Sequence, residues 1–403
     1  MPPRGCKKAA KRASTEEPCV DDEDRISALP DAVLQHVLGF LPAQDAVRAS
    51  VLGTRWSNLW RSTHRLRVAL KPLWSAETQH MFVNRLLLLR DPRSAVEHCE
   101  LDLRGCKLAN TNYVEIWIRH ALLLQARVLD VRYTTVLESR SLVSRFLKVL
   151  RLESVYFQSY ILLDLSSCIA LEDVEFSVCE PDFCEIRCPP SVTRLSMVKC
   201  SFGAVNGRHN DNHTRISAPS LTWLKIDRCD GLPPVLERMP SLQAASVWFG
   251  CSFEDDRSCS TAVLWKKDGC VLLGGLSNAT SLKYRGSFGM ATFKMDLAFC
   301  PLFTNLKTFC LEDFCLTSDV HALLRFLRLT PNLEKLTIEL CEKKICSQLE
   351  VEGYNPIHPP ISLSQLKKVN IKCPTVDERI QRALKAVFTD AGIGNLDKLN
   401  IEH

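Results

Sequence analysis

The hydrophobic positions near the start of the chain recur at intervals of three and four residues, which is the spacing of amphipathic helices. Between residues 29 and 60 this pattern predicts three short helices. Pro30 suits the entry to the first helix and Pro42 its end, whereas the third helix carries Trp56 and Trp60. Helices this short bury too little apolar surface to be stable alone, so we expect part of their surface to dock on another molecule.

From about residue 96 the pattern changes to a recurring unit, apolar-x-x-apolar-x-apolar. Clear copies occupy residues 146–152, 171–176, 192–197, 221–226, 306–311, 333–338, 366–371 and 396–401, and weaker copies occupy residues 99–103, 126–131, 242–247 and 279–284. The last apolar positions of successive copies are 21 to 37 residues apart, about 27 on average, which is the period of leucine-rich repeats. Each copy therefore predicts one strand of an α/β solenoid with a curved parallel sheet.

Alternate side chains of such strands point into the solenoid, and the side chains between them lie on the concave face. The candidates for binding a partner on that face are Trp223, Lys225, Asp227, Trp248, Lys283 and Arg285. The two Trp residues are candidate anchors because aromatic side chains dominate binding hot spots, although a packing role fits them equally well. Charges on this face are of mixed sign, which favours a protein partner over nucleic acid.

Two segments interrupt the repeats. Residues 203–219 are polar and rich in Gly and Asn, which predicts a loop. Its residues His209, Asp211 and His213 are better explained as part of a solvated loop than as metal ligands. The sequence of residues 254–284 predicts a helix that leads into the next strand.

Composition indicates a soluble protein of the nucleus or cytoplasm. The first 25 residues lack the apolar core of a secretory signal, and no apolar run approaches the roughly 18 residues that a membrane span needs. The 19 cysteines are odd in number and include no C-x-x-C pair, which disfavours both a disulfide framework and a zinc site. The basic stretch in residues 4–12 fits either a nuclear-localisation signal or a solvated tail.

The usual local signatures of catalysis are missing from the sequence. It contains no nucleophile elbow, P-loop, dinucleotide-binding turn or zinc-protease motif. We therefore expect no catalytic residue, no metal and no cofactor.

Residues 25–67 resemble the F-box. The residues that carry the resemblance are Leu29-Pro30-Asp31, Val37-Leu38-x-Phe40-Leu41-Pro42, Asp45-Ala46-Val47-Arg48, Val51-Leu52 and Arg55-Trp56-x-x-Leu59-Trp60. F-box proteins dock on a Skp-type adaptor, which links them to a cullin and a RING subunit. By position, the resemblance implies the adaptor contacts Leu29, Pro30, Val33, Leu34, Val37, Leu38, Leu41 and Trp56, with the first two as main anchors. It implies that Val47, Val51 and Leu52, and Trp56 as well, build the domain and its rim.

The chain as a whole resembles plant F-box/leucine-rich-repeat proteins with an FBD-like C-terminal end. The resemblance of the end rests on the strand, helix, strand pattern of residues 365–403, which we expect to cap the solenoid. The expected organisation is a disordered leader (1–24), an F-box (25–67), a helical linker (68–95), leucine-rich repeats (96–364) and the FBD-like end (365–403).

The resemblance implies a non-catalytic, substrate-recognition subunit of an SCF-type ubiquitin ligase. Its F-box would bind the Skp-type adaptor, and its concave face would bind a target protein for ubiquitination and proteasomal degradation. The alternative is a leucine-rich-repeat scaffold that binds the adaptor without delivering a substrate. The sequence identifies neither the target protein nor the process that it serves.

Overall fold

The computed structural model of the 403-residue chain describes residues 26, 28–70, 74–104, 112–134, 136–137, 141–157, 161–181, 183–202, 213–250, 271–286, 291–314, 320–340, 363–373, 385, 388–389 and 399–402. Several predictions lie outside these residues. They are the leader, the part of the 203–219 loop that holds His209 and Asp211, residues 254–270 of the predicted helix, and most of the helix predicted before the last strand.

The N-terminal helical region is less regular than the sequence predicts. It has two α-helices, α1 (Asp31–Phe40) and α2 (Ala43–Arg48), followed by two 3₁₀ segments at Ala49–Leu52 and Leu59–Ser62. The third predicted α-helix is replaced by turns and the second 3₁₀ segment. Ser57 Oγ donates to Thr54 O at 2.7 Å, and such local side-chain hydrogen bonds compete with helix formation.

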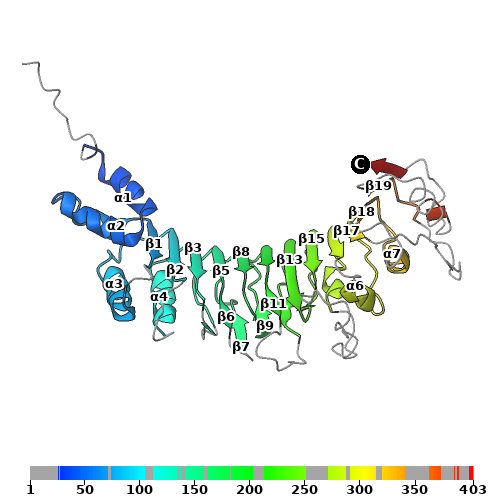
Figure 1. Ribbon diagram of the computed structural model, residues 1–403, viewed down its shortest axis with the longest axis horizontal. Coiled ribbons are helices and arrows are strands. Elements are labelled where there is room, and N and C mark those ends of the chain that lie inside the picture. Colours follow the sequence, from blue (N-terminus) through cyan, green and yellow to red (C-terminus); the bar gives the residue numbers. More distant parts are fainter. Residues whose placement is uncertain are drawn as a thin grey trace, which may run out of the picture.

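One parallel sheet of fourteen strands runs through the molecule (Figure 1). Its order is β1-β2-β3-β5-β8-β10-β13-β15-β16-β17-β18-β19-β20, and β11 (Ser201–Phe202) pairs with the end of β13. The strands are β1 (Arg65–Ala69), β2 (His98–Asp102), β3 (Val128–Arg132), β5 (Val149–Glu153), β8 (Asp173–Ser177), β10 (Arg194–Val198), β13 (Trp223–Gly231), β15 (Ala244–Phe249), β16 (Ser281–Gly286), β17 (Thr308–Phe314), β18 (Lys335–Leu340), β19 (Lys368–Lys372) and β20 (Leu399–Glu402). The row of strands is curved, with both ends raised above the middle in Figure 1.

All twelve strands predicted from the repeat pattern are present in one large parallel sheet, an arrangement consistent with a leucine-rich-repeat solenoid. A thirteenth repeat strand, β1, precedes them and pairs with β2 from Arg65↔His98 to Ala69↔Asp102. The sheet therefore begins near residue 65 instead of residue 96. The segment predicted as a helical linker supplies the end of β1 and helix α3 (Ala76–Leu88), which together form the first repeat.

The back of the solenoid differs between its ends and its middle (Figure 1). Helices lie behind the first and last strands: α3, α4 (Asn112–Leu123), α5 (Leu273–Leu276), α6 (Ala291–Asp296) and α7 (Val320–Arg328). The middle repeats instead carry short strands: β4 (Val136–Leu137) with β6 (Tyr156–Phe157), and β7 (Ile161–Asp164), β9 (Phe183–Arg187), β12 (Arg215–Ser217) and β14 (Val235–Leu236) in a four-stranded parallel sheet. Asp173 and Arg194 of adjacent strands are only 21 residues apart, whereas Arg65 and His98 are 33 apart, so the middle repeats lack the length for a helix.

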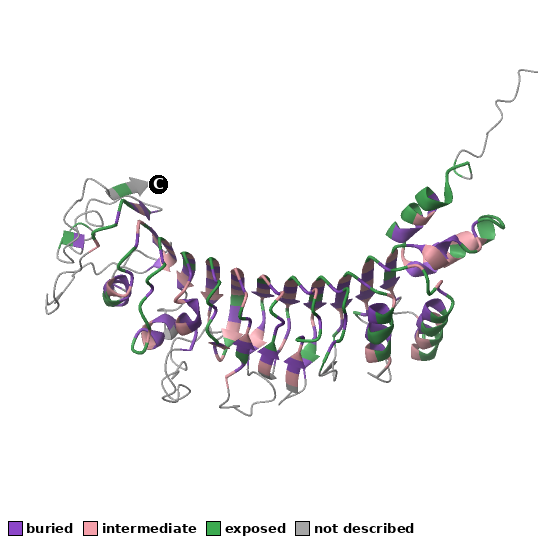
Figure 2. Cartoon of the chain, turned by 180° about the vertical axis from the view of Figure 1, so that it is seen from behind, coloured by how far each residue is buried: buried purple, intermediate pink, exposed green. Residues whose placement is uncertain are grey.

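Alternate residues of each main strand fill the core between the two layers. Leu195 and Met197 of β10, and Leu224 and Ile226 of β13, are fully buried, whereas the residues between them stay accessible. Figure 2 shows buried and less buried positions following one another along the strands of the main sheet. One repeat cannot cover these side chains alone, and its neighbours complete the core.

Cysteines support this stacking where three consecutive strands end. The buried thiols of Cys179, Cys200 and Cys229 occupy the position two residues after their strand's last regular pair. Each donates to a carbonyl of the preceding strand: to Leu152 O at 3.3 Å, to Phe176 O at 3.6 Å and to Met197 O at 3.5 Å. These cysteines are free, and burial raises the pKa of Cys179. They therefore serve as buried hydrogen-bond donors between repeats.

The strand exits also contain residues in the left-handed backbone region. Ser154, Val178, Lys199, Arg228 and Asp313 have φ between 53° and 57°. This conformation is least favourable for a β-branched side chain, so Val178 is the most strained of the five.

Replacing Val178 by Asn should therefore stabilise the protein by about 1 kcal/mol, because Asn tolerates the left-handed region and the valine side chain is half exposed. Urea denaturation measures the change. The same substitution at Val149, which lies in β5, should destabilise the protein because Asn is poor in strands. Equal effects at both sites would show that backbone strain at Val178 is negligible.

Candidate adaptor-binding and partner-binding surfaces

One side of α1 presents apolar side chains to solvent. Val33 and Val37 are 43% and 47% exposed, and Leu29 and Leu41 at the two ends of the helix are also exposed. Phe40, Val51 and Leu52 are further exposed apolar residues of this N-terminal region. An exposed apolar group of this kind on a small domain indicates a site of protein–protein contact.

The entry to α1 is held in place by Arg55. Its Nε donates to Asp31 Oδ1 at 2.8 Å and its Nη2 donates to Leu29 O at 2.5 Å. Pro30 occupies the N-cap with extended backbone angles, and its carbonyl accepts hydrogen bonds from Val33 N and Leu34 N. Arg55 thus fixes the two predicted anchors, Leu29 and Pro30, relative to the helix.

Three of the predicted contact residues lie beneath this surface. Leu34 and Leu38 are 0% and 2% exposed, and Trp56 is also buried. Their side chains point into the core that α1 shares with the 3₁₀ segments, so they support the exposed side of α1 without lying on it. The reverse holds for Val51 and Leu52, which were predicted to build the domain and are 87% and 69% exposed. Spacing alone could not separate the two groups, because the exposed Val33 and Val37 and the buried Leu34 and Leu38 are neighbours on the same broad apolar side of the helix.

The helical domain is attached directly to the solenoid. Gln44 Nε2 of α2 donates to Ala69 O of β1 at 2.6 Å, and Gly39 of α1 lies so close to Arg65 that an added Cβ would sit 3.2 Å from the arginine Cβ. The buried Arg90, two residues after the end of α3, donates to Thr63 Oγ1 at 3.1 Å and to Thr63 O. The exposed side of α1 and the sheet therefore form one body.

The accessible face of the main sheet, here called the open face, carries three rows of side chains. Because all strands pair in register, the first, third and fifth residues of successive strands line up across the sheet. We call these the first, middle and last rows. For β13 they are Trp223, Lys225 and Asp227.

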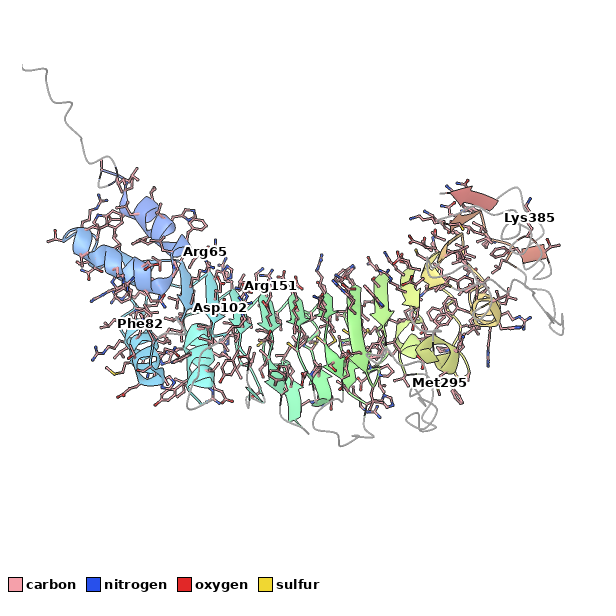
Figure 3. All side chains as sticks on the ribbon, in the orientation of Figure 1. Arg65, Phe82, Asp102, Arg151, Met295 and Lys385 are labelled. Atoms are coloured by element: carbon pink, nitrogen blue, oxygen red, sulfur yellow. The ribbon has the colours of Figure 1, made fainter. Side chains whose placement is uncertain are left out.

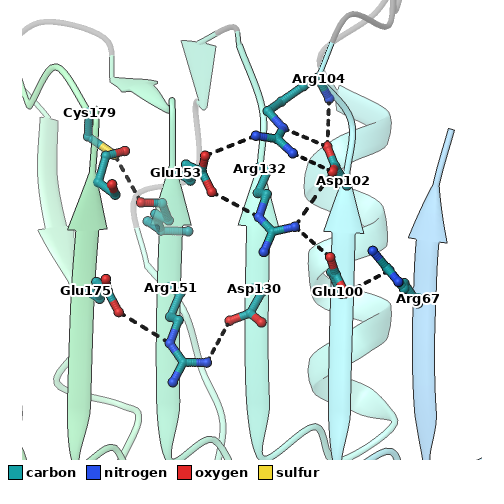
Figure 4. A network of polar contacts seen from close by, with 12 residues as sticks. Arg67, Glu100, Asp102, Arg104, Asp130, Arg132, Arg151, Glu153, Glu175 and Cys179 are labelled. Carbon is teal, nitrogen blue, oxygen red and sulfur yellow. Dashed lines mark hydrogen bonds and ion pairs between the residues drawn. The ribbon is translucent and has the colours of Figure 1, made fainter. Parts of the chain in front are cut away.

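On the first strands the open face is covered by a network of ion pairs (Figure 4). Arg132 lies 2.6 Å from Glu100 and 3.0 Å from Glu153, and Arg104 lies 2.8 Å from Asp102 and 3.1 Å from Glu153. A second group joins Asp130, Arg151 and Glu175, with distances of 3.3 and 3.4 Å. A hollow of about 320 Å³ lies among these residues. Since its charges are already paired, it offers little net attraction to a charged ligand.

This network makes stability depend on pH. Burial would raise the pKa of Asp102, but hydrogen bonds and charge from Arg104, with help from Arg132, hold it below its usual value. For Asp130, burial is likewise outweighed by His98 and Arg151, and the pKa is lowered.

A depressed carboxyl pKa contributes stability above the unfolded-state pKa, about 3.9, and this contribution disappears as pH falls through the folded-state pKa. We therefore expect the melting temperature to fall as the pH is lowered below about 4. The double variant Arg104→Met/Arg132→Met should have a lower melting temperature at pH 7 and a shallower fall in acid. If the melting temperature of the double variant fell with pH as steeply as that of the wild type, the network would not be what lowers these pKa values.

All six residues predicted to bind a partner lie on the open face, near its centre. Figure 3 draws the side chains of the sheet as sticks and labels Arg151, which belongs to the same face. The guanidinium of Arg194 lies 4.8 Å from the ring centre of Trp223, and those of Arg285 and Arg228 lie 4.1 and 5.6 Å from Trp248. Lys225 lies 3.3 Å from Asp227, and Lys283 lies 2.6 Å from Glu312. The sequence pattern predicted these positions but missed Arg194, whose role depends on pairing between β10 and β13.

Within the described residues, no three or more His, Cys, Asp or Glu side chains gather where they could hold a metal ion. Over the same part of the chain, no helix has both the length and the apolar character needed to cross a membrane.

Comparisons with known proteins agree with this division into a helical domain and repeats. A model of the F-box domain matches residues 26–67. The meiotic F-box protein MOF of Oryza sativa subsp. japonica is 27% identical over 350 residues, covering 79% of this chain and 72% of that protein.

Two proteins of Arabidopsis thaliana are similar over a comparable length. F-box/LRR-repeat protein At5g02910 is 25% identical, covering 83% of this chain and 76% of its own length. F-box/FBD/LRR-repeat protein At5g22700 is 26% identical, covering 87% and 86%. The chain therefore contains an F-box domain and is homologous, over most of its length, to plant F-box/LRR-repeat and F-box/FBD/LRR-repeat proteins.

Proposed function

We propose that this protein is the substrate-recognition subunit of an SCF-type ubiquitin ligase. Its F-box binds a Skp-type adaptor, which connects it to a cullin and a RING subunit, and the open face of its repeats binds a target protein. The observation that carries the proposal is the apolar side of α1, exposed within the residues that match the F-box.

The contact surface for the adaptor comprises the exposed residues of the predicted set: Leu29, Pro30, Val33, Val37 and Leu41. Phe40, Val51 and Leu52 extend it. Leu34, Leu38 and Trp56 hold this surface in shape from below. A small number of buried apolar anchors supplies most of the binding energy in such interfaces.

The protein acts by placing its target, and the transfer of ubiquitin takes place elsewhere in the assembled complex. The hydrogen bonds from Gln44 and Arg90 join the F-box to the first repeat. A target on the open face is thereby held at a fixed position relative to the adaptor, and fixed positioning raises the effective concentration of the reacting groups.

The test is complex formation between the purified full chain and a plant Skp-type adaptor, followed by size-exclusion chromatography. We expect a stable 1:1 complex at micromolar concentration, and its loss in the double variant Leu29→Ala/Pro30→Ala. A folded wild-type chain that fails to bind at these concentrations would exclude the proposal.

A scaffold that binds the adaptor without delivering a target for degradation is the second candidate. The two functions differ in the fate of proteins that co-purify with the chain. A proteasome inhibitor lengthens the half-life of a receptor's target, and it leaves the half-life of a scaffold's partner unchanged.

A further inference from the structure

Charge on the open face is segregated between the two halves of the sheet. In β1, β2, β3, β5 and β8, the first and middle rows contain both signs: cations at Arg65, Arg67 and Arg151, and carboxylates at Glu100, Asp130, Asp173 and Glu175. From β10 to β19 the same two rows contain no carboxylate. Their cations are Arg194, Lys225, Lys283, Lys335 and Lys368. The second half of the sheet therefore has a basic band along the side where the strands begin.

The carboxylates of this half lie in the last row, at Asp227, Glu312 and Glu339. Asp227 pairs with Lys225 and Glu312 pairs with Lys283, which partly neutralises the middle row. Within the described residues, the first-row cations Arg194, Lys335 and Lys368 have no carboxylate within 4.0 Å. These three cations are the ones available to an anionic ligand.

Between these cations, and beyond Trp223, the first row carries only small side chains. Trp223 is followed by Ala244, Ser281 and Thr308, and then by Lys335 and Lys368. From Arg194 to Lys335 there are five strand steps, about 24 Å at roughly 4.8 Å per step. An extended peptide covers that distance with about seven residues, at roughly 3.3 Å each.

We propose that the first row from β10 to β19 binds an extended peptide segment that carries anionic side chains near both ends, about seven residues apart. One anionic group contacts Arg194, and the other contacts Lys335 and Lys368. An apolar side chain of the peptide packs on Trp223, which Arg194 covers on one side, and the small residues accept its backbone between the two ends. This inference rests on the proposed function, in which the segment belongs to the target protein.

A peptide fits this surface better than a nucleic acid does. A phosphate backbone carries a charge at every nucleotide and requires a continuous basic surface. Here the cations stand at the two ends of the row, and Asp227, Glu312 and Glu339 line the far side of the same strands. Those carboxylates would repel a ligand that is anionic along its whole length, whereas a peptide with spaced charges avoids them.

The test uses the full chain in complex with the Skp-type adaptor and fluorescence anisotropy with labelled peptide libraries. Each library has five random neutral residues between two fixed pairs, which are Glu-Glu in one library, phosphoserine-Gly in the second and Gln-Gln in the third. We expect the first or second library to bind at least tenfold more tightly than the third. The ratio between the first two shows whether carboxylates or phosphates are the preferred anions.

The double variant Lys335→Glu/Lys368→Glu, and separately Arg194→Glu, should weaken binding of the preferred library at least tenfold. The matched control is Arg119→Glu/Arg145→Glu, which makes the same change in net charge as the double variant at exposed positions outside the band. It should change the affinity less than twofold.

Three results would overturn the inference. The first is no binding of either anionic library, and the second is an equal loss of peptide affinity in the control variant. The third is a single-stranded oligonucleotide that binds more tightly than the peptides and whose binding the Lys335/Lys368 charge reversal weakens. Adaptor binding is measured in the same samples. A failure to bind the adaptor would exclude the proposed function. Intact adaptor binding without peptide binding would exclude only the peptide site.

Discussion

Replacing Val37 by Asp should weaken binding of a Skp-type adaptor at least 100-fold, because it places a charge in the middle of the proposed apolar contact surface. Val37 is 47% exposed, so the substitution opens no cavity in the core. In the complex its carboxylate would lose water without gaining a partner, and such a loss costs several kcal/mol. Isothermal titration calorimetry with the purified adaptor measures the effect.

The matched control is Ile116→Asp. Ile116 lies inside α4, is also β-branched and is 46% exposed, but it belongs to the back of the solenoid. Both variants should lose a similar, small amount of thermal stability, and only Val37→Asp should lose affinity for the adaptor. Similar affinities for the two variants would mean that the adaptor binds elsewhere on the F-box.

Replacing Phe326 by Ala should destabilise the C-terminal half of the solenoid by about 3–5 kcal/mol. Phe326 of α7 is fully buried, and its ring centre lies 4.6 to 5.2 Å from those of Phe293, Phe303 and Phe309. Alanine would leave a cavity among three rings that belong to different parts of the chain, so the surroundings cannot close it without moving several elements at once. Urea denaturation followed by circular dichroism measures the loss.

The same substitution at Phe299 provides the comparison. Phe299 is 64% exposed in the turn after α6, and its truncation should change stability by less than about 0.5 kcal/mol. Since β18 carries Lys335, Phe326→Ala should also weaken the binding of any ligand to the basic band. A loss at Phe326 no larger than that at Phe299 would contradict the aromatic core.

The conformation of the F-box region could be predicted only in part. The three-and-four spacing correctly located α1 and α2, because the apolar positions of an amphipathic helix recur on one side from one turn to the next, even in helices of ten and six residues. It could not predict which apolar residues face outward: Leu34 and Leu38 are buried while Val33 and Val37 are exposed, and Trp56 is buried in a turn. That choice depends on where β1 and the 3₁₀ segments pack, which is tertiary information.

The first repeat was missed for a related reason. β1 contains Leu66 and Val68, but it lacks the preceding apolar residue that makes the repeat unit recognisable. Its identity as a strand follows from its pairing with β2, about 30 residues further along the chain. The short strands behind the middle repeats are likewise stabilised by neighbours in adjacent repeats, and two or three residues alone carry no periodic signal.

The sequence by itself determined the twelve repeat strands, the alternation that sends residues such as Leu195 and Met197 inward, and the position of the F-box. These are local patterns, fixed by the period of a strand or a helix and legible in a few consecutive residues. Only the tertiary structure decided which charges neutralise one another and which remain available. Arg132 meets Glu100 and Glu153 from two other strands, whereas Arg194, Lys335 and Lys368 stand in a row formed by residues up to 174 positions apart, since 368 − 194 = 174. Such contacts arise from strand register across the whole sheet, and a linear pattern does not contain them.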